Sequence, residues 1–370
     1  MKPLLSAALI VRNEERFLEG CLRSLAGRAD EIVVVDTGST DRSREIAGDL
    51  GARLFDHAWA DDFSAARNAA LDAAQGEWIF YIDADERVVE FDRELVVRQL
   101  EDPEYVCYRV LFRPALGLTR YREYRVFRNR PDLRFRGSIH ESLLPALAEV
   151  RRTTGLQVGE SPVALEHLGY EGDLRHKHQR NLPMLRARLA RDPAHVYSWD
   201  HLGNTLFGLG DEAGAEAAWL RAIEVVRRIG RREDSDSLAW VHLGQFLLER
   251  NRDAAALLEE GHRLFPDNLS LTWLHARSRV VAGDYAAAMP LFAELAEVDA
   301  GALVQGSLAY SSNMFGAHAH AALGLCAFRL GRFAESAGHY ARAEALTPGN
   351  LEFRAKRMLA EIRARSPAAR

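Results

Sequence analysis

The hydrophobic pattern of the chain changes near residue 175, and this change constrains the fold more than any other feature. Before it, short apolar runs alternate with helical patterns; beyond it, strand signals vanish and helices with internal similarity follow one another. A chain of 370 residues also exceeds the size at which a single hydrophobic core usually splits. We therefore expect two domains, an α/β domain over residues 1–172 and an all-α domain over residues 173–370.

The first part of the chain has the alternation that is typical of a parallel sheet with helices on both faces. We expect strands at 5–11, 32–35 and 53–55 and another that begins at Trp78. The apolar N-terminus, MKPLLSAALIV, runs directly into charged residues without a cleavage pattern, so it predicts the first strand and not a signal peptide. From residue 105 to about 170 the pattern favours antiparallel strands that extend the sheet.

The second part contains repeated helical units. Trp199, Trp240 and Trp273 open successive units at intervals of 41 and 33 residues, and Leu323-Gly324 marks a fourth. Each is followed by a turn and an alanine-rich second helix, and residues 298–316 are expected to be an insertion. These units resemble tetratricopeptide repeats. Two roles stay open for them: structural stacking or dimerisation, and holding a peptide or protein on a concave surface.

Charge and cysteine content exclude several classes of protein. The net charge of −5 implies no general attraction to nucleic acid, and no segment has the length and apolarity of a transmembrane helix. The three cysteines, Cys21, Cys107 and Cys326, are far apart and lack metal-ligand spacing, so they are expected to be reduced and buried. These features fit a cytoplasmic protein.

Two aspartates end the apolar run WIFYIDADE. Asp83 and Asp85 follow a predicted buried strand, at the edge of a parallel sheet where ligands bind. Carboxylates one residue apart can serve one site together, one binding a hard divalent cation and the other a sugar hydroxyl or a metal-bound water. The pair alone is weak evidence, because Asp-x-Asp is common in loops.

Four motifs of the first domain occur in one order, and together they carry a resemblance. They are VRNEE at 11–15, VDTGSTD at 35–41, ARNAAL at 66–71 and DADE at 83–86. In this order the chain resembles a family 2 glycosyltransferase with the GT-A fold, over roughly residues 4–170. The expected fold class is thus a Rossmann-like mixed sheet of the GT-A type, followed by tetratricopeptide-like repeats.

The resemblance implies a role for each matching position. Asp36 would contact the nucleobase, Val11 and Glu14 would lie against the nucleoside, and Arg67 would belong to the donor pocket. Asp83 would face the ribose or a metal-bound water, and Asp85 would ligate Mn²⁺ or Mg²⁺. Glu86 is interpreted as a neighbouring solvated carboxylate, and a supporting place behind the residues that contact the ligand stays open for it.

Two histidines and a glutamate complete the predicted site. His140 and Glu141 are adjacent in RFRGSIHESL, and a carboxylate near the acceptor could serve as the base. The resemblance makes Glu141 the candidate base and His140 an acceptor-site or metal-site residue. His167 competes with His140 for the metal, and imidazole suits Mn²⁺. His167 is favoured because this leaves His140 to the acceptor side.

The predicted activity is an inverting, metal-dependent transfer of a hexose or N-acetylhexosamine from a nucleotide sugar, with UDP as the expected nucleotide. The expected acceptor is a peptide or protein; a polysaccharide or natural-product acceptor stays open, as does an inactive domain on a binding scaffold. The intact Asp83 and Asp85 argue against the inactive domain. Nine arginines between Arg109 and Arg136 are either solvated strand residues or contacts for phosphates or an anionic acceptor.

Overall fold

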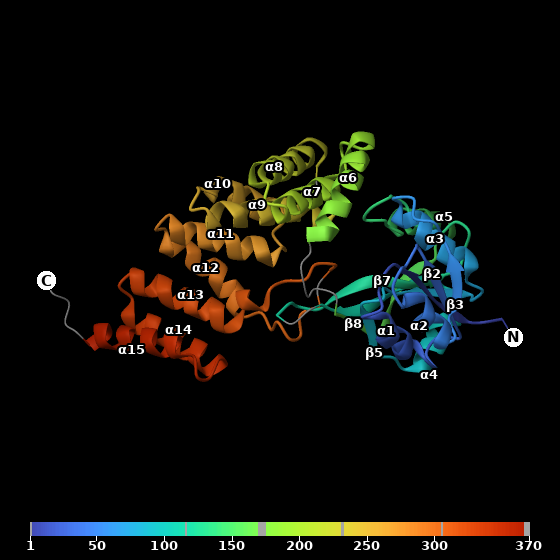
Figure 1. Ribbon diagram of the computed structural model, residues 1–370. Coiled ribbons are helices and arrows are strands. Elements are labelled where there is room, and N and C mark those ends of the chain that lie inside the picture. Colours follow the sequence, from blue (N-terminus) through green and yellow to red (C-terminus); the bar gives the residue numbers. More distant parts are fainter. Residues whose placement is uncertain (1, 115–116, 169–174, 231–232, 305, 366–370) are drawn as a thin grey trace. The chain divides into compact units, whose positions relative to one another are not determined.

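The computed structural model describes residues 2–114, 117–168, 175–230, 233–304 and 306–365 (Figure 1). The chain divides into two compact units, each with its own core. The first consists of Met1–Leu116 and Arg120–Pro193, and the second of Gly117–Thr119 and Ala194–Arg370. The expected domain boundary between residues 172 and 173 lies outside the described residues.

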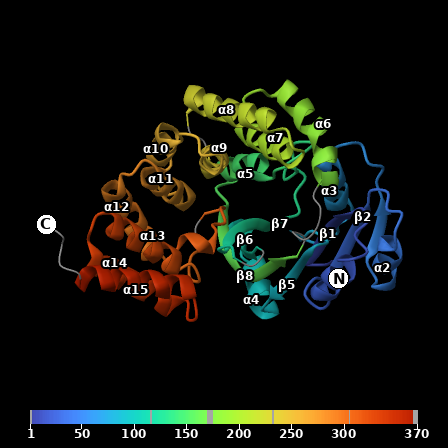
Figure 2. The same cartoon turned by 60° about the vertical axis from the view of Figure 1, so that its left-hand side comes forward.

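The first unit contains one mixed sheet of eight strands in the order β3-β2-β1-β4-β7-β6-β8-β5 (Figure 2). Strands β3, β2, β1 and β4 are parallel, whereas β7 joins β4 and β6 in antiparallel pairing. The expected α/β fold of the GT-A type is confirmed. The strands are β1 (Leu5–Val11), β2 (Glu31–Asp36), β3 (Arg53–Asp56), β4 (Trp78–Tyr81), β5 (Glu86–Glu90), β6 (Tyr105–Arg113), β7 (Tyr121–Arg128) and β8 (Gln157–His167).

Helices cover both faces of this sheet, because its central strands are apolar on both sides. Along β1, Leu5, Ala7 and Leu9 pack into a cluster with helix α1, whereas Ala8 packs into a second cluster with helices α3 and α5. This alternation follows from the two-residue period of a strand. The helices are α1 (Leu18–Leu25), α2 (Ser43–Asp49), α3 (Phe63–Ala73), α4 (Arg93–Leu100) and α5 (Leu144–Thr154).

Helix α6 (Arg175–Arg191) belongs to the first unit, although its sequence has the helical character of the repeats. Its Arg188 guanidinium donates a hydrogen bond to the carbonyl oxygen of Ile139. Residues Met184, Leu185 and Leu189 are its buried side chains. The helix is thus attached to the loop that precedes Glu141.

The second unit is built of antiparallel helix pairs, as expected for tetratricopeptide-like repeats. Glycines let the two helices of a pair approach: Gly203 lies against the indole of Trp219, and Gly324 lies against the ring of Tyr340. The helices are α7 (Val196–Gly208), α8 (Glu212–Ile229), α9 (Leu238–Glu249), α10 (Ala255–Leu264), α11 (Leu269–Val281), α12 (Tyr285–Ala296), α13 (Gly316–Arg329), α14 (Phe333–Leu346) and α15 (Leu351–Arg365).

The insertion between α12 and α13 is part of the core of the second unit. Tyr310, Met314 and Phe315 are buried in it. The backbone N–H of Thr119 donates to the carbonyl of Tyr310 (2.8 Å), and Leu118 forms an antiparallel bridge with Ser311. Because of these contacts, residues 117–119 belong to the second unit.

The expectation that the cysteines are buried is met by the structure. The three cysteines are buried and form no disulfide. Among the described residues, no helix combines the length and the apolarity needed to cross a membrane.

Candidate active site

The loops after β1 and β2 are joined by hydrogen bonds between their motifs. The backbone N–H of Asn13 donates to Ser39 Oγ (2.9 Å), and that of Thr40 donates to Asn13 Oδ1 (2.8 Å). Glu14 N–H donates to Ser43 Oγ (2.8 Å). Asn13 has a φ of 57°, a left-handed conformation that asparagine tolerates better than most residues. VRNEE and VDTGSTD therefore form one rigid edge of the sheet.

Asp36 ends β2 with one carboxylate oxygen engaged and the other free of partners in the described part of the chain. The N–H groups of Gly38 and Ser39 both donate to Oδ1 at 3.0 Å, and Arg44 donates to the same oxygen at 3.1 Å. Oδ2 is buried and has no hydrogen-bond partner there. Burial disfavours the charged form, but the hydrogen bonds outweigh it and lower the pKa of Asp36. A buried, ionised oxygen of this kind is ready to accept an N–H from a ligand.

The turn that holds Asp83 and Asp85 is closed by Glu86. Asp83 N–H donates to Glu86 Oε2 (2.8 Å), and Glu86 N–H donates to the Asp83 carbonyl (3.0 Å). The interpretation of Glu86 as a solvated carboxylate is wrong, since its side chain is 1% exposed. The structural reason is that Glu86 begins β5, which pairs with β8 and lies beneath the turn.

Arg67 on helix α3 joins Asp83 to Glu141. Its Nη2 lies 2.9 Å from Asp83 Oδ1, and its Nε lies 2.5 Å from Glu141 Oε1. The guanidinium also lies over the rings of Tyr81 and Phe135, with its central carbon 5.1 and 5.6 Å from their centroids. Helix α3 begins at Asp62, whose carboxylate caps it by accepting from Ala65 N–H. The helix thus positions Arg67 between the end of β4 and the loop of Glu141.

A second buried arginine, Arg125 on β7, supports the same turn from beneath. It donates to both oxygens of Glu86, at 2.7 and 3.1 Å, and lies 3.7 Å from Asp83 Oδ2. Burial raises the pKa of Glu86 to about 8. Burial acts on Asp83 in the same direction, but Arg67 and Arg125 outweigh it and lower the pKa of Asp83. Asp83 is therefore held as a carboxylate.

Asp85 and His167 bring two possible metal ligands together. His167 Nε2 lies 3.3 Å from Asp85 Oδ2, because His167 ends β8 opposite Glu86 in β5. Glu14 lies close enough that burial, followed by the charges of Asp85 and Asp83, raises its pKa to about 7. Within the described ranges no three His, Cys, Asp or Glu side chains form a closed metal cage. Asp85 and His167 would supply two ligands to a divalent cation, and the surrounding carboxylates favour a positive charge there. The remaining ligands would come from a bound diphosphate.

The loop with His140 and Glu141 is held at its base and strained near its tip. Arg136 and Ser142 exchange two backbone hydrogen bonds of 3.0 Å across it. His140 has a φ of 51°, a conformation that is uncommon for residues other than glycine and occurs often at functional sites. Glu141 follows directly and points to Arg67.

The structure brings Arg67, Asp83 and Glu141 into one contact set and Asp85 and His167 into another beside it. Val11 is placed differently: its side chain is buried in the core, and its carbonyl accepts from Thr37 N–H (2.9 Å). The sequence analysis did not single out Arg125, because nine arginines in that segment looked alike. The one available signal was the apolar context of Val126 and Phe127 on β7.

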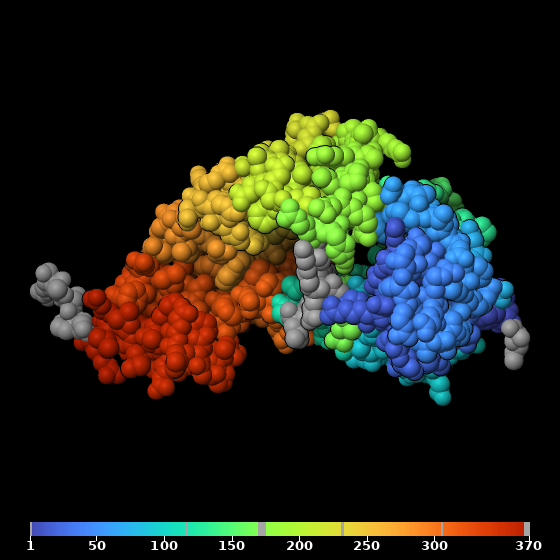
Figure 3. All heavy atoms as spheres, in the orientation of Figure 1, coloured from blue at the N-terminus to red at the C-terminus, as the bar shows by residue number. Residues whose placement is uncertain are grey.

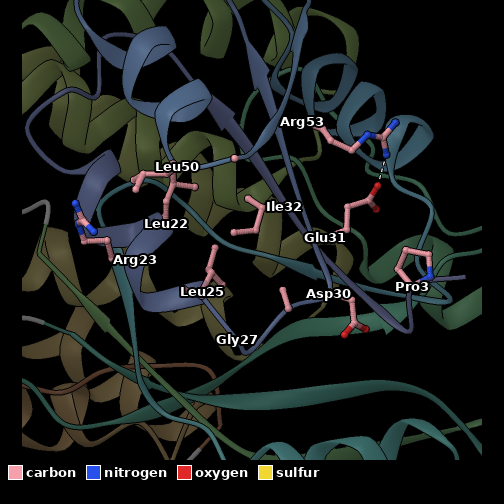
Figure 4. Close-up of a pocket in the computed structure, with 13 residues that line it drawn as sticks. Pro3, Leu22, Arg23, Leu25, Gly27, Asp30, Glu31, Ile32, Leu50 and Arg53 are labelled. Atoms are coloured by element: carbon pink, nitrogen blue, oxygen red, sulfur yellow. Dashed lines mark hydrogen bonds and ion pairs between the residues drawn. The ribbon is translucent and has the colours of Figure 1, made fainter. Parts of the chain in front are cut away.

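A separate hollow lies at the opposite edge of the sheet, where the strands begin (Figure 4). It measures about 600 Å³ and is lined by Leu22, Leu25, Ile32 and Leu50, with Glu31 and Arg53 forming an ion pair at its rim. None of the predicted site residues lines it. The site at the carboxyl ends of the strands is therefore distinct from this hollow.

Comparisons with known proteins agree with the motifs. Residues 6–147 match the family Glycosyl transferase family 2. The chain is 39% identical over 224 residues to a TPR repeat-containing protein of Synechococcus elongatus, covering 58% of this chain and 55% of that protein. It is 28% identical over 145 residues to the SPbeta prophage-derived glycosyltransferase SunS of Bacillus subtilis, covering 38% of this chain and 34% of that protein.

The chain thus spans about half the length of the first of these relatives and a third of the second. Among solved structures, glucosyl-3-phosphoglycerate synthase of Mycobacterium tuberculosis aligns with a TM-score of 0.39 and 17% identity, over 51% of this chain and 80% of that one. The family match covers all four motifs and ends just beyond Glu141. Residues 6–147 are therefore similar to family 2 glycosyltransferase domains, and helical repeats follow them in this chain.

Proposed function

We propose that the first unit transfers a hexose or N-acetylhexosamine from a UDP-sugar to an acceptor with inversion at the sugar carbon. One observation carries the proposal: Arg67 holds the donor-side carboxylate of Asp83 (2.9 Å) and the candidate base Glu141 (2.5 Å) on one guanidinium. A direct displacement needs a leaving group on one side of the sugar and a base on the other. This contact set supports an arrangement in which Asp83 serves one side of the sugar and Glu141 the other.

The nucleoside is proposed to lie against Asp36 and Glu14. The buried Oδ2 of Asp36 can accept one N–H of the base, and uracil offers such a group at N3. Asn13 and Ser39 fix the loop beneath, so the position of Asp36 does not have to form on binding. Preorganisation of this kind reduces the entropic cost of binding.

Asp85 and His167 would hold Mn²⁺ or Mg²⁺. When bound, the cation would neutralise charge that develops on the diphosphate as the glycosidic bond breaks. Carboxylate and imidazole together suit Mn²⁺ better than a purely oxygen site would. Asp83, kept ionised by Arg67 and Arg125, is proposed to accept a hydrogen bond from the ribose or from a metal-bound water.

Glu141 is proposed to take the proton of the acceptor nucleophile. Arg67 engages its Oε1, so Oε2 is the oxygen proposed to receive the proton. The nucleophile then forms its bond to the anomeric carbon as the bond to the diphosphate oxygen breaks. A single base suffices, because no covalent sugar intermediate is formed. His140, next to Glu141, is proposed to contact the acceptor.

A peptide or protein is the proposed acceptor, since stacked helical repeats follow the transferase domain in the same chain and such repeats offer extended binding surfaces. A glycan acceptor is the second candidate. It is favoured by 36% identity over 157 residues to the lipopolysaccharide core biosynthesis glycosyltransferase LpsC of Rhizobium meliloti, covering 38% of this chain and 57% of that protein.

Nucleotide release from UDP-, GDP- and dTDP-sugars in the presence of Mn²⁺ tests the proposal. Asp85→Ala should abolish metal-dependent donor binding, measured by thermal shift. Glu141→Gln should keep donor binding and reduce turnover on the order of 100-fold or more, the usual contribution of a positioned base. The matched control is Glu94→Gln, at an exposed position of helix α4, which should change neither donor binding nor turnover. Unchanged turnover in Glu141→Gln would remove the base assignment, and no binding of any nucleotide sugar would remove the transferase.

A further inference from the structure

Helix α15 carries an apolar stripe on the side that faces away from the second unit. Phe353 and Ala360 are its buried residues, at 5% and 0% exposure. On the opposite side, Leu351, Met358, Leu359 and Ile362 are exposed by 75%, 49%, 48% and 60%. The spacing of seven, one and three residues places these four side chains on one face of a helix.

An exposed apolar stripe of this kind on a helix marks a surface that a partner covers. Leu346 at the end of α14 is also 58% exposed. Helices α14 and α15 are the red part of the molecule in Figure 3. The surface has the character of an interface.

The charges that flank the stripe show which partner fits. Glu352 and Arg363 lie on one flank of α15, and Arg354 and Glu361 lie on the other. In two identical helices packed antiparallel, each flank meets the same flank of the other copy. Glu352 of one copy then faces Arg363 of the other, and Arg354 faces Glu361. The midpoint of each pair in the sequence is the peptide between Arg357 and Met358. One alignment of the two helices therefore forms both kinds of ion pair.

Apolar contacts agree with that register. Met358 lies beside the two-fold axis and would meet Met358 and Leu359 of the other copy, whereas Ile362 would cover Ala355. Within each helix Glu352 also pairs with Lys356 (2.5 Å) and Glu361 with Arg357 (2.6 Å), so each glutamate would bridge two basic side chains in the pair of helices. We propose that α15 is the interface of a homodimer in which two copies of this chain pack their α15 helices antiparallel about a two-fold axis.

The interface would be small. A helix of 15 residues is about 22 Å long. An interface of one short helix from each copy belongs with the small, weak interfaces, for which we expect an affinity in the micromolar range. The dimer should therefore form and dissociate within an accessible range of protein concentration.

Light scattering after size-exclusion chromatography of the full chain, from about 5 to 200 µM, tests this proposal. The expected mass rises towards twice the 41.4 kDa of one chain. Met358→Glu should keep the mass at that of one chain throughout. The matched control is Val281→Glu, an apolar residue on α11 with 72% exposure outside the stripe, which should dimerise as the parent does. Circular dichroism should show the same helix content for all three.

A charge reversal tests the antiparallel register. Glu352→Arg and Arg363→Glu should each weaken the dimer by about tenfold, because like charges then face each other on that flank. The double variant should recover most of the loss, since the pair is restored in reverse. A parent chain that stays a monomer at 200 µM, a dimer unaffected by Met358→Glu, or a double variant no better than the single ones would overturn the proposal.

Discussion

Arg67 is the side chain that joins Asp83, on the proposed donor side of the candidate site, to Glu141, on the proposed acceptor side. Asp83 and Glu141 are 58 residues apart in sequence, and each contacts the same guanidinium. Arg67 and Glu141 are nearly buried, with 12% and 11% of their side chains exposed. An ion pair at this depth adds little net stability, because desolvation of the charges offsets their attraction, but removing one partner is costly since it leaves the other charge buried and unpaired.

We therefore expect Arg67→Met to lower the free energy of unfolding by about 3 kcal/mol, measured by urea denaturation. Arg67→Lys should recover the charge but not both contacts, so its unfolding free energy should lie between that of the parent chain and that of Arg67→Met. The matched control is Arg23→Met, which breaks the exposed pair with Glu19 and should cost under about 1 kcal/mol. Equal losses in Arg67→Met and Arg23→Met would show that the contact set does not stabilise the fold.

Glu14 makes the stability of the first unit depend on pH. Burial and the charges of Asp85 and Asp83 raise its pKa from 4.5 to about 7, so the folded chain binds this proton more tightly than the unfolded one. Stability is then full below about pH 4.5 and falls until about pH 7. Glu14→Gln removes the ionisation, so it should raise the unfolding free energy at about pH 8 relative to about pH 5.

The gain should be about 1 kcal/mol, since solvent screens a side chain that is only partly buried. The measurement is thermal unfolding in EDTA at the two pH values, with Glu94→Gln as control. A gain that is the same at both pH values would contradict the assignment. Added Mn²⁺ and UDP-sugar should reduce the gain, because a bound cation stabilises the charged form of Glu14.

At the scale of single residues, motifs in the sequence singled out Asp83, Asp85 and Glu141 as candidates, and their roles stay predictions. The link through Arg67 could not be predicted, because no local pattern shows that a helix arginine meets a carboxylate 74 residues away. Glu86 was misinterpreted for the same reason: its burial depends on pairing between β5 and β8, which are distant in sequence.

At the scale of elements, the helix pairs of the second unit depend on glycine at the contact between helices. A methyl group on Gly203 would lie 2.3 Å from Trp219 Nε1, closer than any real contact. The indole is buried and donates to Asn204 Oδ1 (3.2 Å), so it has little room to move. Leu-Gly in three of the four units could be recognised from sequence, since both helices were predicted; the side chain that meets each glycine could not.

Gly203→Ala should therefore destabilise the second unit by about 1 to 3 kcal/mol, the usual cost of overpacking. The matched control is Gly338→Ala on α14, where nothing lies within 4 Å of the added methyl. That change should stabilise the helix by about 0.5 to 1 kcal/mol, because alanine loses less backbone entropy than glycine. Urea denaturation of both variants measures the difference, and two changes of the same sign would contradict the packing.

At the scale of the whole molecule, the sequence predicted two domains from the loss of strand signals. Helix α6 shows the limit of that inference. Its pattern is helical like that of the repeats, yet its contacts belong to the first unit, where Arg188 reaches the Ile139 carbonyl. A helix belongs to the unit whose apolar surface it covers. The helical period of its sequence does not show which surface that is.

The contacts of α6 predict which truncated forms of the chain can fold. A chain that ends at Pro193 keeps α6 on the loop before Glu141, whereas one that ends at residue 174 loses Arg188 and the buried Met184, Leu185 and Leu189. Each of these apolar side chains contributes about 1.5 to 3 kcal/mol when buried. The longer fragment should thus fold and bind a UDP-sugar with Mn²⁺ as the full chain does. The shorter one should melt many degrees lower.

Thermal shift with and without donor separates the two fragments. If the repeats hold the acceptor, the longer fragment should hydrolyse the donor but transfer no sugar to the acceptor that the full chain modifies. Equal melting temperatures would mean that α6 is dispensable to the first unit. Full acceptor transfer by the longer fragment would assign acceptor recognition to the first unit alone, and the basic strands β6 and β7 would then be the place to look for it.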